Sequence, residues 1–149
     1  MQPIQNYFDI VEEIIRDLGV DPAACKGEIA GQWNLKRGSA NIWVDVWQTK
    51  DKDGNLLDYG YIQVMAPVCE VPVNNQNLFT KELLEINHSL YGVAFTIFKE
   101  WAYVKAIREV EGLDKAEAQA MFNRVGSYSD EYDEKLKQKY GTAPVGQRV

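Results

Sequence analysis

Histidine and cysteine are scarce in this sequence, whose 149 residues include one histidine and two cysteines. The cysteines, Cys25 and Cys69, form no CxxC pair, and with His88 they cannot complete the four nitrogen or sulfur ligands of a usual structural zinc site. We therefore expect no metal. We interpret the thiols as isolated side chains, with a disulfide only if the fold brings Cys25 and Cys69 together.

The chain also lacks long apolar runs and an excess of basic residues. No segment approaches the ~20 apolar residues of a membrane-spanning helix, and the N-terminus has neither the basic start nor the apolar block of a secretory signal. There are 22 acidic and 16 basic side chains, and the pI is near 4.8. This balance argues against nucleic acid or an anionic membrane as the main partner, and we expect a cytoplasmic protein.

The motifs of common catalytic and nucleotide sites are missing as well, since there is no GxSxG elbow, no GxGxxG and no Walker loop. His88 has no cysteine nucleophile beside it and is interpreted as a surface or helix-end residue. A carboxylate pair such as Asp45 with Asp58 would lie on opposite or offset strand faces. We expect no enzymatic activity, no catalytic residue and no cofactor.

One stretch resembles a calcium loop, at residues 51–55. An EF-hand loop needs glycine at its sixth position and glutamate at its twelfth, whereas here Gly54 is the fourth residue and Ile62 the twelfth. Aspartate and glycine tolerate the left-handed backbone of a hairpin connection, so we predict a turn instead.

This turn joins two predicted strands within residues 41–65, whose side chains alternate between two faces. One face is aliphatic, as a core requires. The other face is aromatic with polar groups interspersed, and we take six of its residues as candidates for binding a partner: Trp43, Asp45, Trp47, Tyr59, Tyr61 and Gln63.

Two interpretations of this aromatic face remain open. The final helix and the C-terminal tail could cover it, and its rings would then form a second core layer. Alternatively, the face is exposed for a partner or a second subunit, because Trp and Tyr offer large contact areas with a polar handle. In a third hypothesis the rings line the pocket of a small-molecule sensor, with Asp45 and Gln63 as its polar contacts.

Periodicity predicts the remaining elements. Residues 101–110 satisfy both a strand and a helix pattern, and we prefer a strand because residues 93–98 need a pairing partner. We expect caps at Asn77 or Thr80 for the second helix and a kink or break at Gly126 in the last. The expected elements are helices at 3–18, 78–90 and 114–140, and strands at 29–36, 39–50, 56–66 (closing at Pro67, with an extended continuation at 68–73), 93–98 and 101–110.

The order helix, three strands, helix, two strands, helix predicts an α+β fold with one mainly antiparallel five-stranded sheet packed against helices. At this length a single domain can bury its own core. We place that domain at residues 1–140 and expect residues 141–149 to be a flexible tail.

The segment LLEINHSLYGVAFTI, residues 83–97, resembles the helix-to-strand passage of the type III secretion chaperone-like fold. With the N-terminal YFDIVEEIIRDLG helix, the central hairpin and the final SDEYDEKLKQKYG helix, the chain is most similar to the YbjN family of bacterial sensory transduction regulators. The residues that match the pattern are Leu83, Leu84, Asn87, Gly92 and Phe95.

This resemblance implies a non-enzymatic α+β domain, commonly a homodimer, that acts as a regulatory or chaperone-like adaptor by binding a protein partner or client peptide. It brings no catalytic residues. The matching residues are interpreted as structural: helix packing, a side-chain amide that satisfies nearby backbone groups, and the turn into the strand.

Overall fold

The computed structural model describes residues 1–141, and residues 142–149 of the expected tail lie outside them. The described part has an α+β fold, as predicted. Its elements are α1 (Ile4–Asp17), α2 (Pro22–Cys25), β1 (Gln32–Arg37), β2 (Ala40–Lys50), β3 (Leu56–Glu70), α3 (Gln76–Asn87), β4 (Ala94–Phe98), β5 (Trp101–Glu109) and α4 (Lys115–Tyr140).

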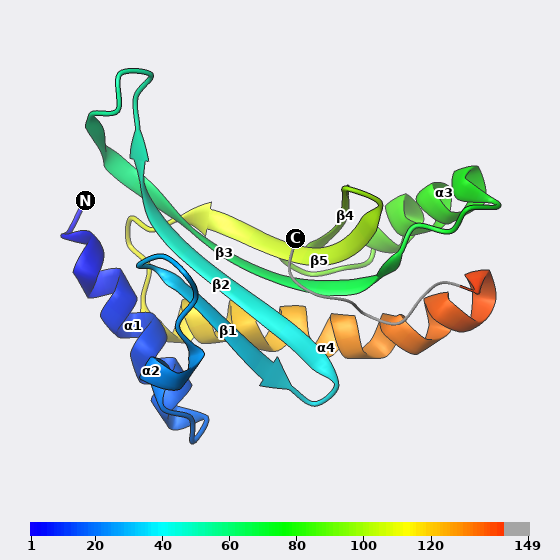
Figure 1. Ribbon diagram of the computed structural model, residues 1–149, viewed down its shortest axis with the longest axis horizontal. Coiled ribbons are helices and arrows are strands. Elements are labelled where there is room, and N and C mark those ends of the chain that lie inside the picture. Colours follow the sequence, from blue (N-terminus) through cyan, green and yellow to red (C-terminus); the bar gives the residue numbers. More distant parts are fainter. Residues whose placement is uncertain (142–149) are drawn as a thin grey trace.

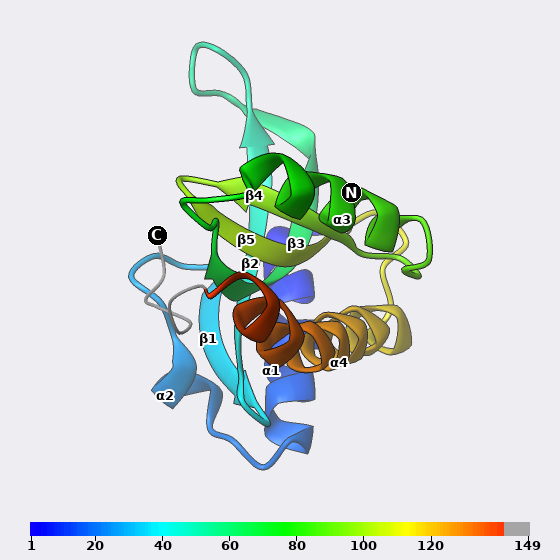
Figure 2. The same ribbon diagram turned by 90° about the vertical axis from the view of Figure 1, so that its right-hand side faces the viewer.

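The five strands form one antiparallel sheet in the order β1-β2-β3-β5-β4. Helices α1 and α4 lie on one side of this sheet, α3 lies beside β4 at its end, and the β2–β3 hairpin projects from the body (Figures 1 and 2). The segment 101–110 is therefore a strand, as preferred. It turns back from β4 through Lys99 and Glu100, which both have positive φ.

The core lies between the aliphatic face of the sheet and the two long helices. Ile42, Val44 and Val46 of β2 are at most 2% exposed, as are Ile62 and Val64 of β3. The apolar stripe of α1 is buried there as well. Helix α4 begins with a capping box. The Glu117 backbone N–H donates to the Asp114 carboxylate, and the Asp114 backbone N–H donates to the Glu117 carboxylate.

The expected break at Gly126 is wrong, because α4 is one continuous helix of 26 residues. Gly126 lies where α4 approaches the β1–β2 hairpin. A Cβ there would stand 2.7 Å from Cδ of Arg37 and 3.1 Å from Cδ1 of Ile42. The glycine thus serves close packing between helix and sheet.

Two strand boundaries differ from the prediction. β1 begins at Gln32 and not Ile29, because Gly31 has a left-handed φ of +86° and a Cβ there would stand 2.2 Å from the Val46 carbonyl oxygen. β3 continues without a break through Pro67 to Glu70, so the first part of the extended continuation expected at 68–73 belongs to this strand. The last β2–β3 pair is Trp43 with Met65, so the missing N–H of Pro67 falls beyond that ladder, at a register shift toward β5.

The helices also differ from the prediction at two places. The linker at residues 21–25 contains the one-turn helix α2, whose first turn the Asp21 carboxylate caps. Helix α3 begins at Gln76, and its N-cap residue is Asn75. Neither Asn77 nor Thr80, the predicted caps, is therefore at the N-cap position. The Thr80 hydroxyl instead donates back to the carbonyls of Gln76 and Asn77.

The turn predicted at residues 51–55 is confirmed. The Asp51 carboxylate accepts hydrogen bonds from the backbone N–H groups of Asp53 and Asn55 and from the Asn55 side chain. Within residues 1–141, no group of three or more His, Cys, Asp or Glu is placed to hold a metal ion. In the same residues, no helix has both the length and the apolar character to cross a bilayer.

Candidate partner-binding face

The six candidate residues lie together on the sheet face opposite α1 and α4, and we call them the aromatic face. Cross-strand pairing places Asp45 opposite Gln63 and Trp47 opposite Tyr61, while Trp43 lies opposite Met65. Paired residues share a face of the sheet. The final helix packs against the other face, so the part of the second-core-layer interpretation that relied on that helix is wrong.

Exposure differs along this face. Trp47 and Tyr59 are 37% and 41% exposed, and Tyr61 between them is half-buried. The Trp47 and Tyr61 rings are 5.7 Å apart, and Tyr59 meets Tyr61 edge to face at 6.2 Å. Trp43, by contrast, is only 4% exposed. The face therefore has an accessible aromatic ladder near the projecting hairpin and a buried tryptophan further along the sheet.

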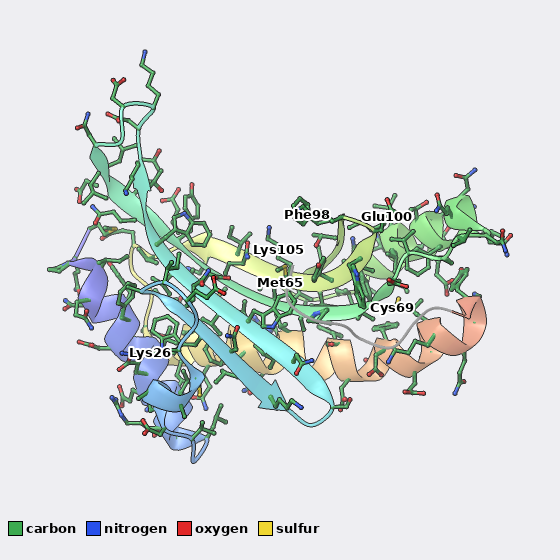
Figure 3. All side chains as sticks on the ribbon, in the orientation of Figure 1. Lys26, Met65, Cys69, Phe98, Glu100 and Lys105 are labelled. Carbon is green, nitrogen blue, oxygen red and sulfur yellow. The ribbon has the colours of Figure 1, made fainter. Side chains whose placement is uncertain are left out.

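Strand β5 extends the face with residues that were not among the six. The register sets Lys105 beside Met65, Ile107 beside Gln63 and Tyr103 beside Pro67. Figure 3 shows Met65 and Lys105 on the side of the sheet away from α4. The signal for these residues was their alternation within 101–110, which the helix alternative for that segment obscured.

The polar centre of the face borders an open cavity of about 430 Å³. Asp45 and Gln63 line it from the sheet, and the loop before β1 closes one side. The apolar walls are Trp47 and Met65 with Ile29 of the loop, which is 66% exposed. The cavity thus combines a carboxylate and an amide with apolar walls.

Tyr103 is the most constrained residue of the face. It is 1% exposed, and its ring lies 6.0 Å from that of Trp43. Within residues 1–141 its buried hydroxyl has no hydrogen-bond partner. Burial raises the pKa of this phenol, so the hydroxyl stays protonated and available as a donor at neutral pH.

The remaining candidates have structural surroundings. His88 is the C-terminal cap of α3. Asp58 lies 3.1 Å from the N-terminal amine of Met1, at the base of the projecting hairpin, and the structure does not pair it with Asp45. Cys25 and Cys69 are both buried, and no disulfide joins them. Burial raises the pKa of the Cys25 thiol, which disfavours the reactive thiolate.

The residues of the helix-to-strand resemblance were interpreted as structural, and most of them are. Asn87 forms two hydrogen bonds with the backbone of Phe95, and Gly92 has a positive φ of 69° in the turn between them. Leu83 is buried in the core. Leu84 is 70% exposed, so its predicted packing role is wrong.

Apolar side chains are also exposed around α3 and β4. Helix α3 turns only part of its surface toward the core, through Phe79 and Leu83. The exposed members are Leu78 (62%), Leu84 (70%), Tyr91 (75%), Ile97 (43%) and Phe98 (57%). This group is a second candidate contact surface, distinct from the aromatic ladder near the hairpin.

No family model matches the sequence, and no curated protein matches it. Solved structures of the same fold do. A chain of the ExsC–ExsE complex aligns with a TM-score of 0.62 and 10% identity, covering 91% of this chain and 97% of that one. A chain of the HopA1–SchA chaperone–effector complex gives 0.58 and 10%, covering 86% and 93%.

YbjN from E. coli aligns with a TM-score of 0.51 and 16% identity, covering 92% of this chain and 96% of that one. Each alignment spans most of both chains, so the likeness concerns the whole domain. The protein therefore has the fold shared by these chaperone–effector complexes and YbjN, as the helix-to-strand passage predicted.

Proposed function

We propose that this protein is a non-enzymatic adaptor, regulatory or chaperone-like, that binds a partner polypeptide on the aromatic face. The observation that carries the proposal is the accessible ladder of Trp47, Tyr61 and Tyr59 on a face that no helix within residues 1–141 covers. Rigid aromatic rings are the usual anchors of protein interfaces. The chaperone–effector complex of similar fold supports a polypeptide as the ligand.

Binding across the face is favoured over strand addition at a sheet edge. At the β4 edge, Asn87 occupies both backbone groups of Phe95. At the β1 edge, Lys26 forms a bridge with Trp33. Helix α1 is also disfavoured, because its apolar stripe is buried in the core. An extended segment lying over the rings, with Asp45 and Gln63 as polar contacts, uses surface that remains available.

The proposal is tested with a displayed random peptide library that is selected on the wild-type protein. Affinities of the enriched peptides are then measured for the double variant Trp47→Ala, Tyr59→Ala. We expect a loss of at least about tenfold, because each truncated anchor costs about 1 kcal/mol or more. Leu18→Ala, which truncates an exposed apolar side chain at the C-terminal end of α1, outside both candidate surfaces, is the control. Equal loss in both variants, or none in either, would reject this face.

We further propose that the protein is a cytoplasmic homodimer. The exposed apolar side chains of α3 and β4 support the dimer, because apolar residues are enriched at the centre of subunit interfaces. Light scattering coupled to size exclusion measures the mass, and Leu84→Asp should convert a dimer to a monomer. A wild-type protein that stays monomeric at high concentration would contradict the proposal.

A small-molecule sensor is the second candidate function, because Asp45 and Gln63 both line the open cavity on the aromatic face. A thermal-shift screen against metabolites distinguishes the two functions. Reproducible stabilisation by one compound, lost in Asp45→Asn and Gln63→Leu, would favour sensing. No stabilisation, together with peptides enriched by the aromatic face, would favour partner binding.

A further inference from the structure

One stretch of the sheet edge has no partner strand. Strand β4 pairs with β5 only as far as Ala94 with Lys105, whereas β5 continues to Glu109, toward the α1 end of the molecule (Figure 1). Strand β3 lies along the other edge of β5. Within residues 1–141, no strand therefore pairs with residues 106–109 on the edge that β4 leaves open.

The direction of the backbone groups at this open edge follows from one hydrogen bond. The Val110 N–H donates to the Gly60 carbonyl of β3 at 3.0 Å. Backbone groups alternate between the two edges of an antiparallel strand, so those of Ile107 and Glu109 point away from β3. The Glu109 carbonyl accepts from Nε of Arg108 at 2.9 Å. The groups that remain for a ligand are the N–H and carbonyl of Ile107 and the N–H of Glu109.

The open edge forms one wall of a cavity of about 450 Å³, and the first half of α4 forms another. The helix presents Ala116 and Ala120 there, whose short side chains leave room beside the strand. From Glu117 to Arg124 the helix rises about 10.5 Å, which is the length of about three extended residues. The cavity therefore suits a short extended segment between β5 and α4.

Charged side chains lie at both ends of this cavity. At one end the Glu117 carboxylate is paired, because it lies 3.1 Å from the Arg108 guanidinium and also accepts the Asp114 N–H. At the other end Arg124 lies beside Gly92, where a Cβ would stand 3.2 Å from Nη1 of Arg124. Arg124 is exposed and has no ion pair in the part of the chain that the structure describes. Its guanidinium is therefore available to a carboxylate.

The path of the chain near Gly92 selects the kind of segment. A strand added antiparallel to β5 has the same direction as β4, so its last residue lies at the end where β4 begins. The chain enters β4 there through Gly92, which turns with a φ of +69°. An added strand cannot continue past this point, because the protein's own chain follows. The added strand must therefore end there, and a free C-terminus places its carboxylate beside Arg124.

We propose that this cavity captures the free C-terminus of a partner polypeptide. The last three or so residues of the partner add to the open edge of β5 through Ile107 and Glu109, and the terminal carboxylate binds the Arg124 guanidinium. Side chains of the segment that alternate toward α4 meet Ala116 and Ala120, so an apolar residue is favoured there. This site is separate from the aromatic ladder and does not depend on the proposed function.

The test uses a random peptide library displayed with free C-termini and selected on the full-length protein. Enriched sequences are synthesised as free acids and as C-terminal amides, and fluorescence anisotropy measures their affinities. The amides should bind at least about tenfold more weakly, and Arg124→Gln should weaken binding of the acids by a similar factor. Lys135→Gln, which removes another exposed cation of α4, is the matched control and should leave the affinity unchanged.

The strand pairing has its own measurement, amide hydrogen exchange followed by NMR. A saturating free-acid peptide should slow exchange of the Ile107 and Glu109 amides, because both gain a hydrogen-bond acceptor. Amides of the projecting turn at residues 51–55 are the control and should not change. This readout separates strand addition from simple attraction between a carboxylate and Arg124.

Four results would overturn the proposal: equal affinities of acid and amide, equal losses in Arg124→Gln and Lys135→Gln, unchanged exchange at Ile107, or no enriched peptide that needs a free carboxylate. Peptides bound by the aromatic face are recognised separately. They lose affinity in the double variant Trp47→Ala, Tyr59→Ala and keep it in Arg124→Gln. Failure of the C-terminus site and failure of the proposed function are thus distinguishable.

Discussion

The side-chain amide of Asn87 holds the backbone of Phe95 through both of its polar groups. Its Oδ1 accepts the Phe95 N–H at 2.6 Å, and its Nδ2 donates to the Phe95 carbonyl at 3.2 Å. One residue at the end of α3 thus supplies β4 with the hydrogen bonds that another strand would otherwise make. This fixes the helix-to-strand passage and blocks part of the sheet edge.

Asn87→Ala should lower the free energy of unfolding by about 2–3 kcal/mol, because both backbone groups of the buried Phe95 lose their partner. Urea denaturation followed by circular dichroism measures the change. Asn77→Ala, at an exposed position of the same helix, is the control and should change stability by less than about 0.5 kcal/mol. Equal effects at the two positions would contradict the assigned role.

Gly126→Val should destabilise the protein by about 1–3 kcal/mol, because added methyl groups would overlap Arg37 and the buried Ile42. The control is Ser127→Val on the exposed side of α4, which carries the same helical cost of a β-branched residue without the overlap. Thermal unfolding of both variants compares them. A stabilised Gly126→Val would mean that the β1–β2 hairpin yields easily at this contact.

Trp43 and Trp47 should respond differently to truncation although they share one face. Trp43→Ala removes a buried ring and should cost about 3–5 kcal/mol, whereas the partly exposed Trp47 should cost about 1 kcal/mol. Chemical denaturation of the single variants checks this order. For this reason, binding experiments are better based on Trp47 and Tyr59. Similar losses for both tryptophans would contradict the difference in burial.

Tyr140 should give the protein an alkaline stability limit. The hydrogen bond to Glu82, helped by burial, raises the pKa of Tyr140 to about 12. The pKa of tyrosine in an unfolded chain is about 10. The stabilisation from the Tyr140–Glu82 hydrogen bond is therefore complete below about pH 10 and is lost as the pH rises toward about 12. The stability difference between wild type and Tyr140→Phe should therefore shrink across that range.

Urea unfolding at several alkaline pH values measures this difference. Other phenols and lysines titrate in the same range, so only the difference between variants is informative. Tyr91→Phe, at a 75% exposed position, is the control and should show no such convergence. A Tyr140→Phe difference that stays constant up to pH 12 would exclude the contact with Glu82 as its source.

Much of the fold could be predicted because it depends on local alternation. The parity of residues 41–65 placed Asp45 with Gln63 and Trp47 with Tyr61 on one face, and the register confirms these pairs. The turn at Asp51 followed from its own side-chain chemistry. These features need only neighbours within a few residues, which the sequence displays directly.

The parts that could not be predicted depend on contacts between distant segments. Gly126 was expected to break its helix, and only the approach of Arg37 and Ile42 explains why it does not. The sequence likewise could not show which face of the sheet α4 covers, because that depends on how the helix packs against distant strands. The alternation of side chains also could not predict that Trp43 is buried while Trp47 is exposed, because both residues lie on the same face of the strand.

Strand β3 changes partners along its length of 15 residues. In the strand registers, Leu56 and Gly60 pair with β2 only, residues 66, 67, 69 and 70 pair with β5 only, and residues 61–65 pair with both strands, while the Gly60 carbonyl also accepts the Val110 N–H just past β5. The projecting hairpin and the α3 end of the sheet can therefore open as separate cooperative units around this short doubly paired centre. In native-state hydrogen exchange, amides of residues 61–65 should exchange last, while the two ends respond independently to denaturant.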